Sequence, residues 1–457
     1  MKKNLKRAMG IMGSCVLLAG SIGCNPSSGN GPIPLLPEST TVKPTSNNSP
    51  VELSGEVVNL TQGVNPSEVE NVAISNISEA QLESLSKAYI DLANQTASYD
   101  VNGNMLLSPF SISTALGMTE NGAAGETLTQ MEETANGGLS RGELNTIMYA
   151  MANEMNASED VKWNVANSLW LKDDGAWKLK DRFLNDVVTY YHPALYKAPF
   201  NDNTVKDINN WVKSETHDMI PEILDYIPGD TVAYLINAVA FEAEWGVQYE
   251  DNDVLEGRLF TNANGSESKV TMLSSTEGRY ITLEGAEGFV KPYKGGQYSF
   301  VALLPEEGVS TSEYLKKLDD NDADFSKAVR EAKYEDVNVL MPEFTMDYDI
   351  ELSETYKAMG MDLPFEEGKA DFTDMLEPAS GEPYEVWIGR ILHKTHIEVD
   401  RKGTKAAAAT VVEMDAKCTA VEINDVHYVT LDRPFVYAIV DNETGLPLFL
   451  GCQNSMN

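Results

Sequence analysis

Residues 403–414 limit what this chain can fold into more than any other stretch of its sequence. The even-numbered positions carry Thr, Ala, Ala, Thr, Val and Met, whereas the charges of Lys405 and Glu413 fall on odd positions. Successive side chains of a β-strand point to opposite faces. As a strand, the segment would have one small, uncharged face and one solvated face. Because glycine, alanine and charge surround it, it need not always be a strand, and we interpret it as a segment able to slide into a sheet.

Composition sets the broad class. Of the 457 residues, 42% are hydrophobic, which is ample for a large core, although length alone would allow more than one domain. The net charge is −36. Binding to a polyanion needs clustered Lys and Arg, so this charge argues against a nucleic-acid partner. An acidic surface is typical of a soluble exported protein.

The N-terminus is typical of a targeting segment. Residues 1–7 are basic, residues 8–19 are mostly apolar, and small residues precede Cys24. The apolar stretch is too short to span a bilayer comfortably and resembles a signal peptide, and the residues before Cys24 resemble a bacterial lipobox. We therefore expect residues 1–23 to be removed and Cys24 to carry a lipid that anchors an exported protein to a bacterial membrane or cell surface. The alternative is ordinary signal cleavage and a free secreted protein.

The predicted domain organisation is simple. Residues 25–50 are rich in Pro, Ser, Asn and Gly and predict a disordered tether, while residues 51–76 have apolar residues without a clear period. We assign residues 24–76 to the lipidated cysteine and its tether, and residues 77–457 to one folded domain. Of the four cysteines, Cys418 and Cys452 remain in that domain, too few for a disulfide scaffold.

Periodicity in the folded part mixes helices and strands. Ser78 and Gln81 fit a capping box at the start of a helix. Residues 163–171 alternate like a strand, and residues 232–241 are nearly all apolar, like a strand buried on both faces. Residues 435–440 and 446–452 flank a turn-forming stretch and predict a hairpin. The mixture lacks βαβ regularity, so the predicted fold class is α+β.

The sequence carries no enzyme signature. It has no nucleophile elbow, phosphate-binding Walker loop, His-Glu-x-x-His or Cys-x-x-Cys motif. His393 and His396 lie three apart in a predicted strand, 391–399, so they face opposite sides and cannot share a metal there. We interpret both as structural histidines and predict neither metal nor cofactor. A thiol enzyme that uses Cys418 stays conceivable, although nothing marks its partner.

Seven motifs, in order along residues 78–457, resemble those of the serpin family. They are NMLLSPFSI at 104–112, LINAVAF at 235–241 followed by Trp245, LLP at 303–305, MPEF at 341–344, His393-Lys394 leading to Gly403-Thr404, RPF at 433–435, and PLFLG at 447–451. One such motif alone would be weak, but seven in the correct order are specific.

The resemblance implies a single domain of the serpin fold, with three β-sheets, eight or nine helices and an exposed reactive-centre loop at about residues 401–428. It implies a protease inhibitor rather than an enzyme, acting as a monomer. In the family, a serine protease cleaves the loop, and the loop then inserts into the main sheet before the acyl-enzyme is hydrolysed. A papain-like cysteine protease is a further possible target.

The resemblance also assigns roles to individual residues. The hinge of the loop would consist of Gly403, Thr404, Ala406, Ala407, Ala408 and Ala409. The polar cluster beneath the opening sheet, called the shutter, would consist of Ser108, Ser111, Asn237 and His393. Trp245 would mark the breach, the place where insertion begins.

Counting from Gly403 in the family register places the cleaved bond between Lys417 and Cys418. Lys417 suits a trypsin-like pocket with an acid at its base. A cut at Met414 would suit chymotrypsin-like proteases and one at Ala416 elastase-like proteases. Residues 417–434 are longer than usual for the family, which leaves these alternatives open.

One residue departs from the family pattern. Arg401 stands where the family usually has a Glu that pairs with a Lys, and we expect a charge-reversed pair with Glu306 or Glu307. The remaining functional alternative is a non-inhibitory surface lipoprotein of the same fold that only binds a partner. Such relatives typically carry bulky or charged hinge residues, which residues 404–410 lack on their even positions.

Overall fold

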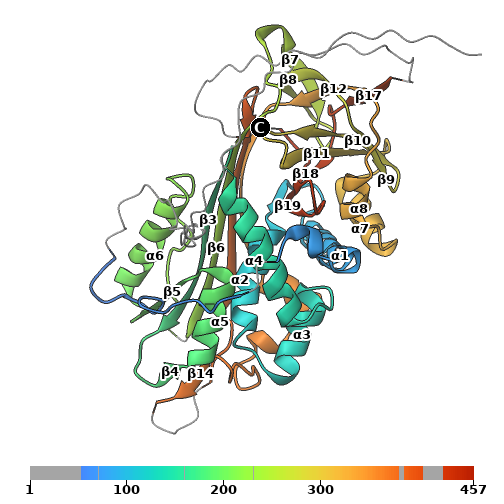
Figure 1. Ribbon diagram of the computed structural model, residues 1–457. Coiled ribbons are helices and arrows are strands. Elements are labelled where there is room, and N and C mark those ends of the chain that lie inside the picture. Colours follow the sequence, from blue (N-terminus) through green and yellow to red (C-terminus); the bar gives the residue numbers. More distant parts are fainter. Residues whose placement is uncertain are drawn as a thin grey trace, which may run out of the picture. The chain divides into compact units, whose positions relative to one another are not determined.

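The computed structural model describes residues 53–69, 72–158, 160–229, 231–379, 385–404 and 426–456. Within them, nine α-helices surround three large β-sheets, which confirms the predicted α+β class (Figure 1). The helices are α1 (Glu79–Ala97), α2 (Pro109–Glu120), α3 (Gly125–Ala135), α4 (Arg141–Ala157), α5 (Asp181–Tyr191), α6 (Asp202–Glu215), α7 (Thr311–Asp320), α8 (Phe325–Arg330) and α9 (Ser353–Ala358).

The largest sheet has seven strands and runs the length of the domain (Figure 1). Across the sheet its strands are β1 (Val58–Asn59), β5 (Ala194–Ala198), β3 (Val161–Lys172), β6 (Ala233–Glu244), β16 (Gly403–Thr404), β15 (Arg390–Val399) and β13 (Phe344–Glu351). The predicted strands at 163–171, 232–241 and 391–399 are its β3, β6 and β15. They are the long central strands of the sheet.

Two further sheets form the other end of the domain. The six-stranded sheet has the order β2 (Met105–Leu107), β19 (Pro447–Gln453), β18 (Phe435–Asp441), β11 (Tyr298–Pro305), β10 (Ala286–Pro292) and β9 (Tyr280–Leu283). The four-stranded sheet has the order β17 (His427–Thr430), β12 (Val337–Pro342), β8 (Glu267–Glu277) and β7 (Val254–Thr261). The predicted hairpin is the antiparallel pair β18 and β19. A short pair, β14 (Leu376–Pro378) and β4 (Trp177–Leu179), completes the strands.

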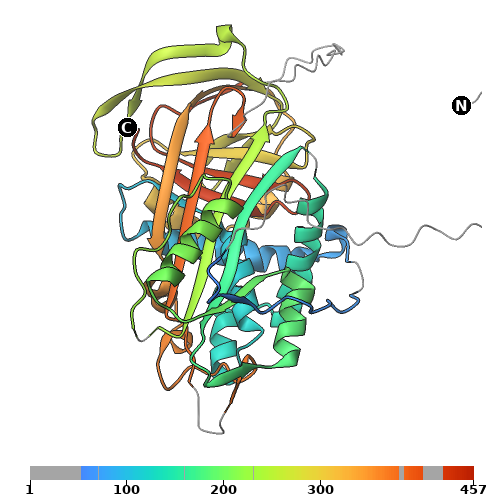
Figure 2. The ribbon, with the colours of Figure 1, turned by 90° about the vertical axis from the view of Figure 1, so that its left-hand side faces the viewer.

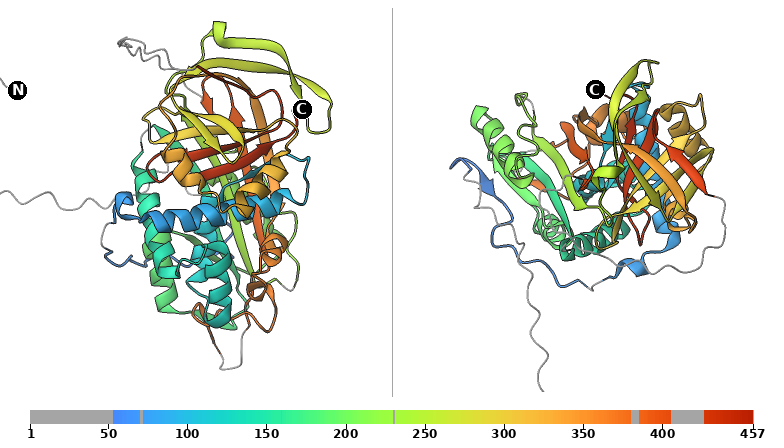
Figure 3. Two further views of the ribbon diagram at one scale, coloured as in Figure 1. Left: turned by 90° about the vertical axis from the view of Figure 1, so that its right-hand side faces the viewer. Right: turned by 90° about the horizontal axis from the view of Figure 1, so that it is seen from above.

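The seven-stranded sheet is covered on both faces, as its apolar strands require. Residues of β6 alternate between the faces: Leu235, Val239 and Phe241 lie in the cores on the side of α2, and Ile236 and Ala238 pack under α6. We call these the back face and the front face. Figure 2 shows α6 in front of the long strands. On the far side of the domain, α1 packs against α7 and α8 beside the six-stranded sheet (Figure 3).

The helix starts follow from local sequence. Ser78 and Gln81 form the predicted capping box at α1. α2 begins with Pro109, whose missing N–H costs nothing in the first helical turn. Nearly every residue of α2 is buried, because the helix lies between the seven-stranded sheet and β19.

The described fold includes residues that precede the predicted boundary at residue 77. Within the expected tether, Val58 pairs with Lys197 and makes β1 the edge strand of the seven-stranded sheet. Ser54 donates to both carboxylate oxygens of Asp207, at 2.9 and 2.6 Å. The folded part therefore includes residues 53–69, whose short strand has no periodicity that the sequence could reveal.

Candidate functional site

The upper end of the seven-stranded sheet holds the first residues of the predicted hinge. β16 lies between β6 and β15 and is antiparallel to both: Gly403 faces Glu244, and Thr404 faces Ala243 on one side and Val399 on the other. Below β16, β6 and β15 pair directly in parallel, from Tyr234 with Arg390 to Ala240 with His396. We call the boundary between β6 and β15 the seam. At the upper end of the seam, the two residues of β16 therefore separate β6 from β15. In its lower part, the two strands bond directly to each other.

Thr404 is fully buried on the back face. Its side chain is 0% exposed, and its Oγ1 lies 2.6 Å from the hydroxyl of Tyr293 in the loop after β10. Burial raises the pKa of Tyr293 above its ordinary value, so the phenol stays neutral and suits a hydrogen bond to another hydroxyl. Thr404 is the one even-numbered position of residues 404–414 that the structure describes, and it faces inward as predicted.

Gly403 is required by its surroundings. A Cβ atom at this position would lie only 2.1 Å from the carbonyl oxygen of Ala243. Any other residue would push β16 away from β6. The glycine thus allows the chain to turn directly into the sheet.

Trp245 holds the turn that leads into β16. Its indole Nε1–H donates to the carbonyl of Asp400 at 2.8 Å, and its backbone N–H donates to the carbonyl of Lys402 at 2.9 Å. The Asp400 carboxylate in turn accepts from the N–H groups of Lys402 and Gly403. The predicted breach residue therefore contacts the turn between β15 and β16 directly.

Arg401 has a different acidic partner from the one expected. Its guanidinium donates to Asp251 at 2.8 Å, and its backbone N–H donates to Glu343 at 3.2 Å. Glu306 instead follows β11, where its N–H donates to Gly285. The prediction of a pair with Glu306 or Glu307 was wrong, because sequence gives no distance between β11 and the turn at 400–403. The charge-reversed environment is nevertheless present, since both groups that accept hydrogen bonds from Arg401 are carboxylates.

The four predicted shutter residues come together in the lower seam, against the start of α2. His393 on β15 and Asn237 on β6 are register partners, and the Nδ1 of His393 is bonded to the Oδ1 of Asn237 across the seam. Asn237 Nδ2 donates to Ser111 Oγ and to Asn167 Oδ1, both at 2.6 Å. Ser108 Oγ donates to the carbonyl of Leu448 at 2.7 Å. This network ties both strands of the seam to α2 and β19.

The bonds of His393 fix its tautomer. The backbone N–H of Ser108 donates to Nε2 at 3.1 Å, so Nε2 is an acceptor and Nδ1 carries the proton that it donates to Asn237. Complete burial lowers the pKa of His393 from 6.5 to about 3. The ring is therefore neutral at physiological pH. His396 faces the other side of the strand, beside Asp347 at 2.7 Å, as the odd spacing predicted.

Several predicted site residues lie outside the described residues. They are Cys24, Ala406, Ala407, Ala408, Ala409, Lys417 and Cys418. Sequence reasoning also missed Tyr293 and Asn167, which complete the two hydrogen-bond networks. Neither belongs to a pattern that distinguishes it from the other tyrosines and asparagines. Cys452 lies within the described residues. It is buried, and burial raises the pKa of its thiol to about 12.

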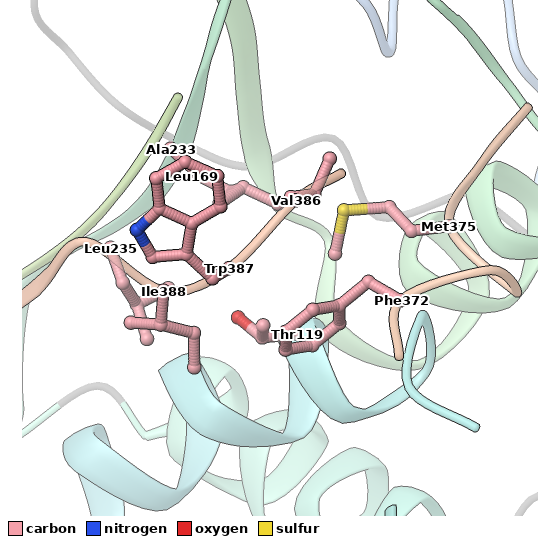
Figure 4. A pocket seen from close by; sticks show the side chains of 9 residues that line it. All are labelled: Thr119, Leu169, Ala233, Leu235, Phe372, Met375, Val386, Trp387 and Ile388. Carbon is pink, nitrogen blue, oxygen red and sulfur yellow. The ribbon is translucent and has the colours of Figure 1, made fainter. Parts of the chain in front are cut away.

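An apolar pocket lies at the foot of the seam on the back face (Figure 4). β6 contributes Ala233 and Leu235, α2 contributes Thr119, and the chain before β15 contributes Trp387 and Ile388. Phe372 and Met375 form its opposite wall. The remaining lining residues are Leu169 and Val386. Its free volume of about 10 Å³ is roughly what one water molecule needs. Among the described residues, no helix is long and apolar enough to cross a membrane.

Comparisons with known proteins agree on one family. The family model described as "Serpin (serine protease inhibitor)" matches residues 83–455. The chain is 29% identical over 387 residues to leukocyte elastase inhibitor A of Rattus norvegicus, covering 81% of this chain and 98% of that protein. Among solved structures, the thermophilic serpin tengpin in its native state matches with a TM-score of 0.79 and 39% identity, covering 88% of this chain and 100% of that chain. Tengpin in its latent state matches with a TM-score of 0.70 and 38% identity, covering 84% and 99%.

Proposed function

The chain belongs to the serpin family, and on that premise we propose that it traps a serine protease as a covalent acyl-enzyme by inserting its cleaved reactive-centre loop into the seven-stranded sheet. The family is one of protease inhibitors with inhibitory relatives. The observation that carries the proposal is the position of Thr404 in the sheet. The first inward-facing hinge residue already lies between β6 and β15, at the position from which a new strand can grow.

The chemistry is that of an interrupted hydrolysis. The serine oxygen of the protease attacks the carbonyl carbon of residue 417, an ester forms, and the amine of residue 418 leaves with the proton that the protease histidine returns. Hydrolysis of the ester then needs an intact oxyanion hole and triad. Insertion that displaces the bound protease and distorts these groups stops the reaction at the ester.

The register of β16 supports insertion along the whole seam. If the antiparallel ladder of Thr404 with Ala243 continues, Ala406, Ala408 and Thr410 come to lie opposite Phe241, Val239 and Asn237. All three β6 residues belong to the back face or the shutter. The uncharged, even-numbered positions would thus be the buried ones. Thirteen further residues reach Lys417, so its bound protease would travel roughly 43 Å at 3.3 Å per residue.

In the same proposed register, both charges of the segment would lie opposite suitable partners on the front face. Lys405 would lie between Glu242 on β6 and Glu398 on β15. Glu413 would lie between Tyr234 and Arg390. Cross-strand pairs of opposite charge contribute little to stability, about 0.2–1 kcal/mol each. Their effect would be on register, because a shift by one residue would bury both charges.

The apolar pocket at the foot of the seam fits the end of such a strand. Val412 would lie opposite Leu235, and Met414 would lie opposite Ala233, both of which line the pocket. On the β15 side, Met414 would face Gly389, so small residues would flank the long side chain. The pocket is too small for methionine while the seam is closed. A new strand separates β6 from β15 by about 4.8 Å more, which would enlarge it.

One gel assay tests the proposal. Purified protein is mixed with trypsin, and a complex that survives boiling in SDS is expected, together with a fragment released by cleavage after Lys417. Cleavage without a complex would instead indicate the non-inhibitory alternative. Mass spectrometry of the fragment decides between cleavage at Lys417, Ala416 and Met414, and chymotrypsin and elastase are tested in parallel.

We also propose that the protein is exported and carries a lipid on Cys24. The support is the basic start, the short apolar stretch and the small residues before that cysteine. The 28 residues between Cys24 and Leu53 could span roughly 100 Å when fully extended. Incorporation of labelled fatty acid into the wild-type protein, but not into Cys24→Ser, is the expected result. Equal incorporation would refute lipidation at this cysteine.

A further inference from the structure

A buried ion pair lies directly beneath the breach. Lys291 on β10 donates to Glu277 at the end of β8 over 2.8 Å, and the two side chains are only 3% and 8% exposed. A buried charge is costly unless it is paired and hydrogen-bonded. The pair joins the six-stranded sheet to the four-stranded sheet at this point.

The ion pair is enclosed by the aromatic residues of the breach. The ammonium group of Lys291 lies 5.4 Å from the ring of Trp245 and 4.5 Å from the ring of Tyr249. Cation–π attraction favours both arrangements and is stronger when the cation is shielded from water. Glu277 also accepts from Ser275 Oγ at 2.6 Å, and Ser275 Oγ lies 3.3 Å from the hydroxyl of Tyr249. Each aromatic residue is thus held by the ion pair or by its hydrogen-bond network.

The same two aromatic residues hold the start of the loop. The backbone N–H of Trp245 donates to Lys402 at 2.9 Å, and that of Tyr249 donates to Arg401 at 3.0 Å. Trp245 also stacks on Tyr293, with ring centroids 4.7 Å apart and planes 7° apart, and Tyr293 binds Thr404. A continuous set of contacts therefore leads from Lys291 and Glu277 to the seat of Thr404.

We infer that Lys291 and Glu277 are positioning residues that fix the turn at 400–403 and the seat of Thr404, and that they thereby raise the fraction of encounters in which insertion precedes hydrolysis. The second part of this inference rests on the proposed function; the first part does not. Hydrolysis and insertion compete for the same ester. If Thr404 is displaced from its position between β6 and β15, insertion is slower, more of the ester is hydrolysed, and the protein behaves as a substrate instead of an inhibitor. The number of inhibitor molecules consumed per trapped protease measures that competition.

The test uses two variants, because removal of one partner alone is expected to disturb folding. Lys291→Met leaves the Glu277 carboxylate buried without its cation, so its midpoint of thermal unfolding should fall by several degrees. Lys291→Met combined with Glu277→Met replaces the pair by apolar groups, which commonly preserves stability, so its midpoint should return close to the wild-type value. If the ion pair positions the turn, two other properties of the double variant should not return to their wild-type values.

The first property is hydrogen exchange at the amides of Trp245 and Tyr249, which should be about tenfold faster in the double variant than in wild type, because opening of the turn exposes them. The second is the stoichiometry of inhibition against trypsin, which should rise at least about twofold as insertion loses to hydrolysis. Arg330→Met is the matched control, since it breaks the bidentate pair with Glu79 on α1, at 2.7 Å and far from the breach. It should change neither property.

Wild-type exchange and wild-type stoichiometry in the double variant would overturn the inference and leave the pair with a purely structural role. Faster exchange with unchanged stoichiometry would overturn the link to inhibition. If the wild-type protein forms no complex with trypsin, chymotrypsin or elastase, the proposed function and the link to inhibition both fail. Exchange still decides whether the pair positions the turn.

Discussion

The two halves of the seam join the same strands in different ways. At the upper end, β6 and β15 are held apart by Gly403 and Thr404, and each strand bonds to β16 instead. In the lower part they bond to each other, and His393 and Asn237 add a side-chain bond across the boundary. The upper end thus has the form of an inserted sheet and the lower part that of a closed one. The difference indicates that separation of β6 and β15 must advance downward. It starts where the two strands are already apart and proceeds to where their hydrogen bonds must first be broken.

The largest expected effect comes from destroying the upper arrangement. Thr404→Arg would place a guanidinium in a fully buried site beside the Tyr293 hydroxyl, and a buried charge is costly unless it is paired, so insertion should fail. Trypsin should still cleave the loop, but the SDS-stable complex should disappear. Thr404→Val, which keeps the shape and loses one hydrogen bond, is the control and should retain most trapping. An arginine variant that traps as well as wild type would rule out insertion at this position.

The lower arrangement should weaken in acid. Because the folded pKa of His393, about 3, lies below its ordinary value of 6.5, the unfolded chain binds more protons than the folded one between these values. The contribution of this group to stability is therefore complete above about pH 6.5 and is lost progressively as pH falls toward 3, by up to about 5 kcal/mol. Urea unfolding between pH 7.5 and 4.5 measures it. The wild-type curve should fall more steeply than that of His393→Gln, whereas parallel curves would refute the assignment.

Removal of the bond across the lower seam at neutral pH should have a smaller effect on stability. His393→Ala leaves the backbone N–H of Ser108 and the side-chain oxygen Oδ1 of Asn237 without their partner. The free energy of unfolding should fall by about 1–3 kcal/mol. The weakened seam should open more readily, so heat-induced polymerisation or spontaneous loop insertion should be faster. His396→Ala is the matched control from the same strand, since His396 faces the front beside Asp347. Equal polymerisation rates in the two variants would remove His393 from the control of opening.

The smallest expected effect tests the register that would join the two halves. In protein cleaved after Lys417, a double-mutant cycle of Glu413→Gln and Arg390→Gln should show a coupling of about 0.2–1 kcal/mol. In uncleaved protein the coupling should be absent, because Glu413 would not yet lie beside Arg390. Glu413→Gln with Lys394→Gln is a control pair, since Lys394 lies four residues farther along β15. Coupling of equal size in the control would contradict the proposed register.

The sequence predicted the long strands well but not the contacts between them. The apolar run that became β6 is a strong local signal, because that strand is buried over nearly its whole length, and the alternation in β3 is a second local signal. The motifs that resemble the serpin family identified His393, Asn237, Ser108 and Ser111, which the fold brings together. Periodicity alone would not have done so, since these residues come from three distant segments.

The failures have a physical pattern. Arg401 received the wrong partner because a charge pair depends on the spacing of turns, and no local signal encodes that spacing. β1 was assigned to the tether because a two-residue edge strand shows no period. Lys291 and Glu277 passed unnoticed because nothing in the sequence distinguishes a buried charge from an exposed one.

Seated between two strands, Thr404 also has a kinetic consequence. Growth of a hydrogen-bonded ladder has a slow nucleation step, in which chain entropy is lost before bonds compensate for it, and fast propagation afterwards. With Thr404 already paired on both sides, the loop would begin from a formed nucleus. Its insertion rate would then depend on how quickly each following residue can be added, a step for which a run of alanines is well suited. Insertion would thus compete with hydrolysis without first passing through its slow nucleation step.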